Sequence, residues 1–455
     1  MRKTFFTTLF AVTIALAAVS SCQNKSTELN PVAEPSWYNY ETYFKEKTTI
    51  FADLPIYNND IVMLGDEIID FGEWEAFFND TCMVNRGIMY EGSPHTLYRV
   101  DGIAAAAPSK IFVSTGLMDF MMEKDDSKMP SVASEVSKNV LEIFSRAKII
   151  SPETELYFMS IIPDRQVTAA AVEAIKTANE TIKAGAKDFT YIDMSSMTDA
   201  SGMMDESLTF DKRSLNGLGY EKLCTLIENN VGLKHVNVAN DHKYTNMSPA
   251  HKDRATIFNS LPKKTHSVMF LGNSITRRGP WNELIPVVRT TNRGIGGDVL
   301  KGIYNRLDDV IEDEPTAIFI MAGINDLNNP NSKVDEAWTT YQQIIEKLIK
   351  ELPSTSIFVQ STLPVTAEYD KDTVTNAKVA ELNKYLEAAA DKYEYTYLDI
   401  ASLLSDENGC LKPEYTFDGL HPTADAYFIW STKIIDSGDV LVLSQMQKAR
   451  MDTVK

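Results

Sequence analysis

Residues 268–276 have the sequence Val-Met-Phe-Leu-Gly-Asn-Ser-Ile-Thr, an apolar run that leads directly into a turn carrying Ser274. A continuous apolar run of this length predicts a strand that is buried on both faces, as in a parallel sheet. Ligands bind at the carboxyl ends of the strands in open sheets of this kind. The stretch therefore predicts a parallel sheet with Ser274 exposed at its carboxyl edge.

The sequence that follows Ser274 supports an α/β fold. Apolar runs recur at 317–322, 356–361 and 396–399, and apolar residues at helical spacing fill 334–352 and 372–393. Strands that alternate with helices indicate a parallel sheet with helices packed on both faces.

The chain carries one set of motifs twice, 207 residues apart. The second set contains three chemical groups that the first lacks. Ser274 corresponds to Glu67, Asn325 to Met118 and His421 to Ser214. A period this long predicts a duplicated domain rather than a solenoid. We expect domains at 36–234 and 241–445.

The second copy contains the residues that ester hydrolysis requires. Ser274 can serve as the nucleophile, His421 as its general base and Asp418 as the residue that orients the imidazole. The oxyanion needs hydrogen-bond donors, and the candidates are the backbone N–H groups of Ser274 and Gly297 and the side-chain amide of Asn325.

These blocks resemble those of the SGNH (GDSL-type) hydrolases. The form at 292–298, Asn-Arg-Gly-Ile-Gly-Gly-Asp, resembles the subgroup related to platelet-activating-factor acetylhydrolase. The resemblance implies a flavodoxin-like α/β/α sandwich in each copy and the triad and oxyanion hole given above. It also implies carboxylic ester hydrolysis without a metal or an organic cofactor.

The first copy is expected to be inactive, because Glu67 cannot form an acyl-enzyme, Ser214 cannot act as the base and Met118 cannot donate to an oxyanion. Three roles remain open for this copy: packing against the second domain, shaping its cleft, or binding a glycan without turnover.

Arg277, Arg278 and Trp281 follow the nucleophile in the sequence, and each has two interpretations. Arg277 and Arg278 could bind the carboxylate of an acidic sugar, or they could be structural. Trp281 could stack on a sugar, but Trp74 repeats it in the degenerate copy, which favours packing.

The N-terminus has the features of a lipoprotein signal peptide at 1–22, with small residues before Cys22, followed by a polar tether at 23–35. Lipidation of Cys22 would anchor the protein in a bacterial cell envelope. The net charge of −19 disfavours nucleic acid as a partner. Cys82, Cys224 and Cys410 are expected to be buried free thiols.

Taken together, the sequence predicts an exported, lipid-anchored serine esterase that removes small acyl groups, with O-acetyl groups on carbohydrates as the leading substrates. A lysophospholipase or arylesterase of the same fold, and a glycan-binding lipoprotein without activity, are the alternatives.

Overall fold

The computed structural model describes residues 29–36, 40–236, 244, 247–262, 267–370 and 374–437. The described residues from 34 onward form one compact unit. The signal peptide and Cys22 lie outside the described residues. No helix in the described ranges is long and apolar enough to cross a membrane.

The first half contains a five-stranded parallel sheet in the order β2-β1-β3-β4-β5. Its strands are β1 (Ile61–Gly65), β2 (Met83–Gly87), β3 (Lys110–Ser114), β4 (Glu155–Met159) and β5 (Thr190–Ile192). Its helices are α1 (Glu41–Asp53), α2 (Glu67–Asp70), α3 (Trp74–Phe78), α4 (Ser93–Ala105), α5 (Leu117–Met122), α6 (Met129–Ile150), α7 (Ala169–Gly185) and α8 (Gly217–Val231), with short 3₁₀ helices η1 (Asp126–Lys128), η2 (Ser195–Met197) and η3 (Glu206–Leu208).

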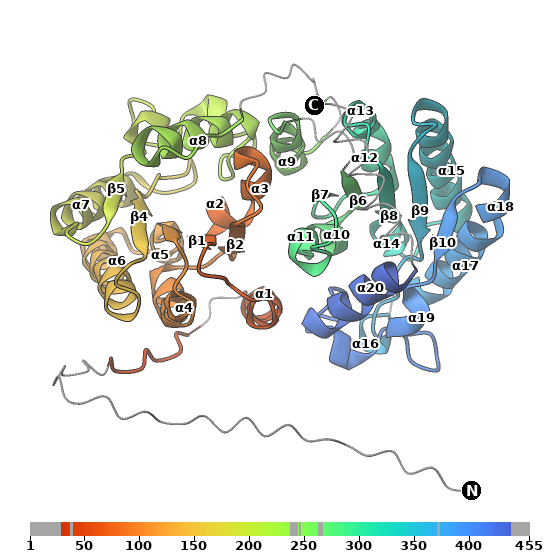
Figure 1. Ribbon diagram of the computed structural model, residues 1–455, viewed down its shortest axis with the longest axis horizontal. Helices are drawn as coiled ribbons and strands as arrows, with labels where there is room; N and C mark the ends of the chain where they lie inside the picture. Colours follow the sequence, from red (N-terminus) through yellow and green to blue (C-terminus); the bar gives the residue numbers. More distant parts are fainter. Residues whose placement is uncertain are drawn as a thin grey trace, which may run out of the picture. The chain divides into compact units, whose positions relative to one another are not determined.

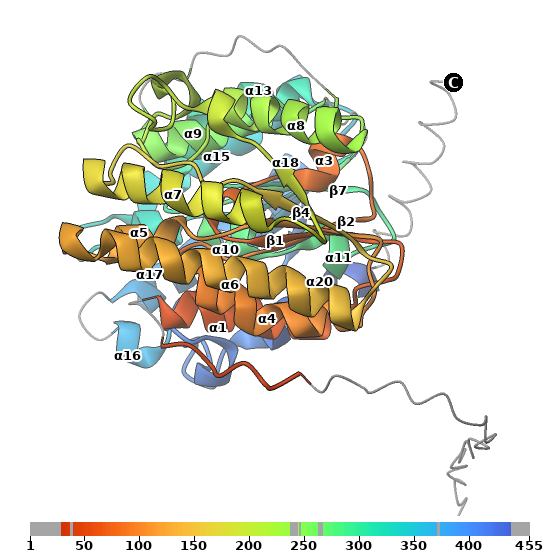
Figure 2. The same ribbon diagram turned by 90° about the vertical axis from the view of Figure 1, so that its left-hand side faces the viewer.

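Alternate residues of the central strand β1 bury two separate clusters, one on each face of the first sheet. Val62 and Leu64 pack with residues of α4, α6 and α7, whereas Ile61 and Met63 pack with residues of α3 and α8. Figure 2 shows α4, α6 and α7 side by side over their face. Burial on both faces explains why this strand is apolar throughout.

The second half repeats this arrangement, with strand order β7-β6-β8-β9-β10 (Figure 1). Its strands are β6 (Val268–Gly272), β7 (Thr290–Gly294), β8 (Ala317–Met321), β9 (Ser356–Gln360) and β10 (Thr396–Leu398). Its helices are α9 (Pro249–Asn259), α10 (Ser274–Arg278), α11 (Trp281–Leu284), α12 (Leu300–Asn305), α13 (Leu307–Glu312), α14 (Ile324–Leu327), α15 (Val334–Glu351), α16 (Ala367–Asp370), α17 (Thr375–Ala388), α18 (Ala390–Tyr393), α19 (Ala401–Leu404) and α20 (Ala424–Asp436), with the 3₁₀ helix η4 (Pro413–Tyr415).

The predicted fold class is therefore confirmed: the chain contains two parallel sheets of the α/β class, each with five strands. The strands and helices expected from apolar runs in the second half are present, with boundaries within a few residues of the prediction. Cys82, Cys224 and Cys410 are free thiols, and Cys224 is buried as expected; the expectation of burial was wrong for Cys82 and Cys410, which are partly exposed. The domain boundaries and the common origin of the two halves stay predictions.

Strand β7 is the element that the apolar pattern did not reveal, because its sequence is Thr-Thr-Asn-Arg-Gly. Its Asn292 and Arg293 side chains nevertheless have polar partners inside the protein, although Nε and Nη1 of Arg293 are buried without a hydrogen-bond partner among the described residues. The Asn292 amide donates to the carbonyl oxygens of Thr276, Arg277 and Gly279, and the Arg293 guanidinium pairs with Asp313 at 2.6 Å. A strand can be polar where its buried polar side chains find such partners.

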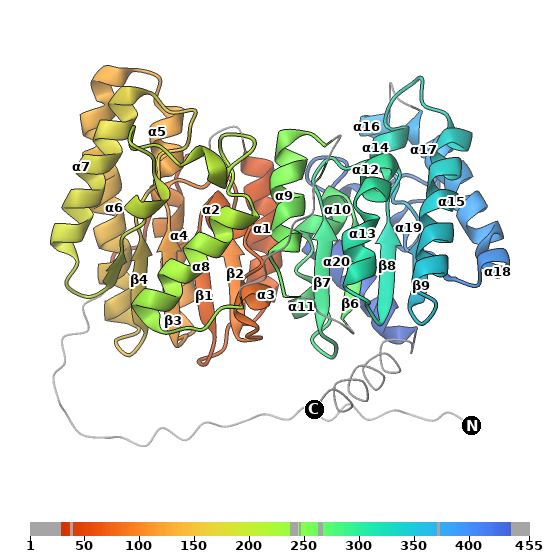
Figure 3. The same ribbon diagram turned by 90° about the horizontal axis from the view of Figure 1, so that it is seen from above.

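The helices that precede the two sheets are exchanged: each packs on a helix of the other half. Helix α1 precedes the first sheet but packs on α20, and its Ile50 belongs to the core of the second half. Helix α9 precedes the second sheet but packs on α8, and its Ile257 belongs to the core of the first half. In Figures 1 and 3 both helices lie between β2 and β7. Each half therefore contributes a helix to the other.

Candidate active site

Ser274 is the first residue of α10, immediately after strand β6 and the turn at Gly272 and Asn273. The Asn273 side chain caps the helix by accepting a hydrogen bond from the N–H of Ile275 at 3.0 Å. Because the first N–H groups of a helix have no intrahelical partner, the N–H of Ser274 can donate to a ligand. The turn places the hydroxyl at the carboxyl edge of the sheet, as the sequence predicted.

A hydrogen-bonded series joins Ser274, His421 and Asp418. The Ser274 Oγ lies 2.9 Å from Nε2 of His421, and Nδ1 of the same ring lies 2.6 Å from Oδ2 of Asp418. Asp418 also accepts from the backbone N–H of His421 at 2.7 Å, so its carboxylate is fixed relative to the ring. An Asp that holds the proton on Nδ1 leaves Nε2 as the acceptor for the serine hydroxyl.

The electrostatics of the pair suit a general base that is neutral near pH 7. Burial is the main reason that the pKa of His421 is lowered from its usual 6.5, and the charge of Arg278 acts in the same direction. Burial would raise the pKa of Asp418, but the hydrogen bonds and charge of His421 outweigh it and hold that pKa well below its usual range. Asp418 is therefore ionised throughout the working pH range.

The two further oxyanion candidates come from separate loops. Gly297 has φ of +72° and is exposed, and a Cβ there would meet only Nε2 of His251, at 3.6 Å. The Asn325 amide in α14 donates one N–H to the carbonyl oxygen of Asp298 at 2.8 Å, which fixes its orientation. The amide carries a second N–H, which can serve as a donor to a ligand.

Buried ion pairs and caps hold these loops. Asp298 pairs with Arg306 at 2.9 Å, and Arg306 also donates to the carbonyl oxygen of Gly272 at 3.0 Å. Asp326 accepts from the N–H of Leu300 at 3.1 Å, which ties α14 to the start of α12. Asp298 therefore holds the loop through its ion pair with Arg306.

The residues after the nucleophile have structural partners. Trp281 is 1% exposed, stacks on Phe270 with ring centroids 4.1 Å apart and donates to the carbonyl oxygen of Thr276. Arg277 lies over the Phe71 ring, 3.9 Å from its centroid. Arg278 forms an ion pair with Glu46 of α1. Packing thus explains Trp281, and a ligand role for the two arginines stays a prediction.

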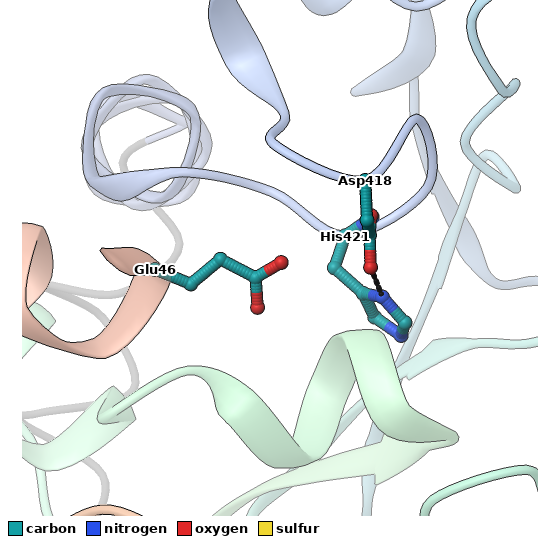
Figure 4. Close-up of side chains that lie close together, drawn as sticks. All are labelled: Glu46, Asp418 and His421. Carbon is teal, nitrogen blue, oxygen red and sulfur yellow. Dashed lines mark hydrogen bonds and ion pairs between the residues drawn. The ribbon is translucent and has the colours of Figure 1, made fainter. Parts of the chain in front are cut away.

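Glu46 is the residue of this region that sequence reasoning missed. It is 1% exposed and points toward Asp418 and His421 (Figure 4). One carboxylate oxygen each of Glu46 and Asp418 and a ring nitrogen of His421 lie within 4.8 Å of one another, a grouping with the ligand types of a metal site. The Arg278 guanidinium already neutralises Glu46, and both nitrogens of His421 are hydrogen-bonded, so the cluster fits an extended triad better than a cation site.

The corresponding residues of the first half form a different series. The Ser214 hydroxyl lies 2.8 Å from Oε1 of Glu67 and 3.0 Å from Oδ2 of Asp211, and Arg213 pairs with Glu67 at 2.8 Å. A hydroxyl has one proton and can donate it to only one of these two carboxyls. In the other contact a protonated carboxyl can donate to the hydroxyl oxygen. Burial is the main cause of a raised pKa of Glu67, which fits that role.

The space beside this series is small. A cavity of about 20 Å³ is lined by Glu67, Met118 and Ser214, among others, which is room for about one water. A second cavity of about 220 Å³ is lined by Arg213, His251 and Gly296, among others, and so reaches the glycine loop of the second half. Both volumes are below the usual range for small-molecule sites.

A parallel α/β fold in which a serine, a histidine and an aspartate are hydrogen-bonded in series has the arrangement of a serine hydrolase. Residues 270–429 match the model of the GDSL-like Lipase/Acylhydrolase family. This part of the chain belongs to that family, which confirms the resemblance found in the sequence.

The chain is also similar to individual proteins. The chain is 26% identical over 151 residues to the N-acylneuraminate cytidylyltransferase of Escherichia coli, covering 33% of this chain and 35% of that protein. It is 26% identical over 171 residues to platelet-activating factor acetylhydrolase IB subunit alpha2 of Rattus norvegicus, covering 36% of this chain and 72% of that one. A GDSL-like lipase structure from Bacteroides thetaiotaomicron is 25% identical, with a TM-score of 0.36, and the match covers 41% of this chain and 96% of that one. The chain thus spans about a third of the first relative.

Proposed function

We propose that the protein is a serine ester hydrolase whose second half carries out the reaction and whose first half does not. Ser274 attacks the ester carbonyl, His421 takes the serine proton and passes it to the leaving alcohol, and Asp418 stabilises the imidazolium. Water then hydrolyses the acyl-enzyme with His421 again as the base. The observation that supports this most directly is the hydrogen-bonded series from Ser274 through His421 to Asp418.

The proposed substrates are small acyl esters, with O-acetyl groups on carbohydrates first. The E. coli relative is named for an N-acylneuraminate, which is an acylated acidic sugar, and the rat relative for an acetylhydrolase. Arg277 is the residue available to an acidic sugar, since its Nη2 is buried without a hydrogen-bond partner among the described residues. A lysophospholipase or arylesterase is the alternative within the same chemistry.

The proposed location is a bacterial cell envelope, through a lipid on Cys22. The basic start, the short apolar run and the small residues before the cysteine support it.

The decisive experiment measures acetate release from a panel of O-acetylated sugars, beside a short-chain and a long-chain nitrophenyl ester, for the wild type and Ser274→Ala. Serine-dependent acetate release supports the carbohydrate substrate. Turnover of the long-chain ester alone would favour the lipolytic alternative. The absence of serine-dependent turnover on every substrate would contradict the proposed function and leave the glycan-binding alternative, which glycan binding to the full chain would test.

The pH dependence follows from the lowered pKa of His421. The ring must be neutral to accept the serine proton, so kcat/KM should rise with pH through a midpoint below 6.5 and fall about tenfold per pH unit below it. The measurement is kcat/KM from pH 4 to 8 on a substrate that does not ionise, with unfolding monitored at each pH. A profile whose lowest midpoint lies above 6.5 would contradict the burial of the base.

The Glu67→Ala variant should keep kcat and KM within about twofold of the wild type, because Glu67 bonds Ser214 and Arg213 rather than any residue of the Ser274 series. A large loss of rate with the fold retained would mean that the active half has been misassigned. Glu67→Ser in the Ser274→Ala background should restore no turnover, because that half has neither a histidine base nor an amide at Met118.

A further inference from the structure

We propose that Glu46 is a positioning residue of the active site. It lies on α1, the helix that the first half contributes to the second, and it pairs with Arg278, which lies beside the Asp418–His421 pair. The inference rests on the proposed function and deepens it, because it gives the degenerate half a part in the reaction.

The position of Glu46 is fixed by the packing of α1. The buried residues of this helix are Tyr43, Phe44, Glu46 and Ile50, so Glu46 occupies a position on the apolar face. The helix packs on α20, which follows the loop carrying Asp418 and His421, while its Tyr43 and Phe44 cluster with Ile88 of the first half. A carboxylate buried on an apolar face is costly unless a cation pairs with it.

The cation is Arg278. Its guanidinium pairs with Oε2 of Glu46 and lies over the Tyr43 ring of the same helix, 4.8 Å from the centroid. The same Nη1 atom lies 3.9 Å from Oδ2 of Asp418, the oxygen that bonds His421. Arg278 therefore stands between two carboxylates, one from each half of the chain.

This geometry has a chemical consequence. An unneutralised arginine beside Asp418 would compete with His421 for the carboxylate and would oppose the charge that the ring gains when it takes the serine proton. Glu46 draws Arg278 away from Asp418 and adds a negative charge beside the ring. Figure 4 shows the Glu46 carboxylate directed toward that pair. Its second oxygen, Oε1, is buried and has no hydrogen-bond partner among the described residues.

The first half contains a counterpart, which is an independent observation. Asp253 on α9 stands 207 residues after Glu46, on the other exchanged helix. It accepts hydrogen bonds from the N–H groups of Phe210 at 2.7 Å and Asp211 at 2.8 Å. Asp211 is the counterpart of Asp418. Each exchanged helix thus brings one buried carboxylate to the aspartate loop of the other half.

The ionisation of Glu46 should be detectable as a pH dependence of the reaction rate. Burial raises its pKa to about 7; the charge of Arg278 opposes this rise and the charge of Asp418 adds to it. The charged and titratable groups that face it are Arg278 of α10, Asp418 and His421 of the loop, Lys47 and Tyr43 of α1, and Tyr427 of α20. As the pH rises through about 7, Glu46 gains its negative charge and His421 becomes a stronger base, so the rate should show a second rise there.

The test uses the full chain and two measurements that need no known substrate. The first is the titration of His421 by NMR, assigned by the loss of its signal in His421→Gln. The second is the rate at which a fluorophosphonate labels Ser274 as a function of pH. Because Glu46 ionises near pH 7, in Glu46→Gln we expect the part of the His421 titration near pH 7 to disappear, so that the apparent pKa of His421 falls. We also expect the labelling plateau to fall about tenfold, with no second rise near pH 7.

Controls separate positioning from stability. Glu41→Gln changes an exposed carboxylate on the same helix and should leave both measurements unchanged. Arg278→Gln removes the opposite charge, so the pKa of His421 should rise, and this variant keeps the inference testable if Glu46→Gln does not fold. If Glu46 were purely structural, Glu46→Gln would lower the unfolding temperature and leave the pKa of His421 unchanged.

The outcomes separate the two proposals. Failure of the wild type to be labelled at Ser274 would contradict the proposed function, and the His421 titration would still decide on Glu46. An unchanged titration in a folded Glu46→Gln, or in Arg278→Gln if the former does not fold, would overturn the inference. Opposite shifts of the His421 pKa in the two variants would support it.

Discussion

The Ser274→Ala variant should lose ester turnover by a factor of about 10⁴ or more while the chain stays folded. The hydroxyl is the group that forms the acyl-enzyme, and no other hydroxyl is bonded to Nε2 of His421 among the described residues. Alanine removes only the hydroxyl, and the cap of α10 by Asn273 is untouched.

The measurement is kcat for release of the acyl group, with circular dichroism and thermal unfolding as the check on the fold. The exposed Ser354→Ala is the matched control and should behave as the wild type. His421→Ala should show a loss similar to that of Ser274→Ala, because residues of a triad act as a unit and their losses do not add. Retention of more than a few per cent of the rate in Ser274→Ala would mean that another group is the nucleophile.

The Asn325→Ala variant should lower kcat by about 10² to 10³, with a smaller effect on KM. An oxyanion donor acts on charge that exists only in the transition state, so its loss appears in kcat. The Asn325 amide is held by the carbonyl oxygen of Asp298 at 2.8 Å, which fixes the direction of its second N–H before substrate binds.

The measurement is kcat and KM on the best ester from the panel. Asn331→Ala, an exposed asparagine in the loop after α14, is the matched control and should leave both constants unchanged. An equal rise in KM with kcat unchanged would indicate instead that Asn325 binds the ground state of the substrate.

The sequence predicted most of the second half because its features are local. Four successive apolar residues before Ser274 indicate a strand buried on both faces, and the carboxyl ends of parallel strands lie at one edge of a sheet. Residues that follow different strands, such as Ser274 and Asn325, are therefore predicted to lie near one another without knowledge of their contacts. Strand β7 was missed because its burial depends on partners elsewhere in the chain, such as Asp313 for Arg293.

The expectation that the first half is inactive also came from residue types alone. Glu67 and Met118 lack the chemistry of the serine and asparagine to which they correspond. The sequence did not show what replaces the triad, namely a Ser214 hydroxyl held between two carboxyls and an arginine paired with one of them. These contacts depend on side-chain geometry rather than on the motif.

The sequence by itself determined the fold class, the half that carries the hydrolase motifs and the identity of Ser274, His421 and Asp418 as the candidate triad. Only the tertiary structure decided that α1 and α9 are exchanged and that Glu46 meets Arg278 beside Asp418. The reason is physical: strand order follows from local pattern and chain connectivity, whereas an amphipathic helix can cover any apolar surface of matching shape. Which surface α1 covers is settled by packing between residues that are more than 200 positions apart in the chain.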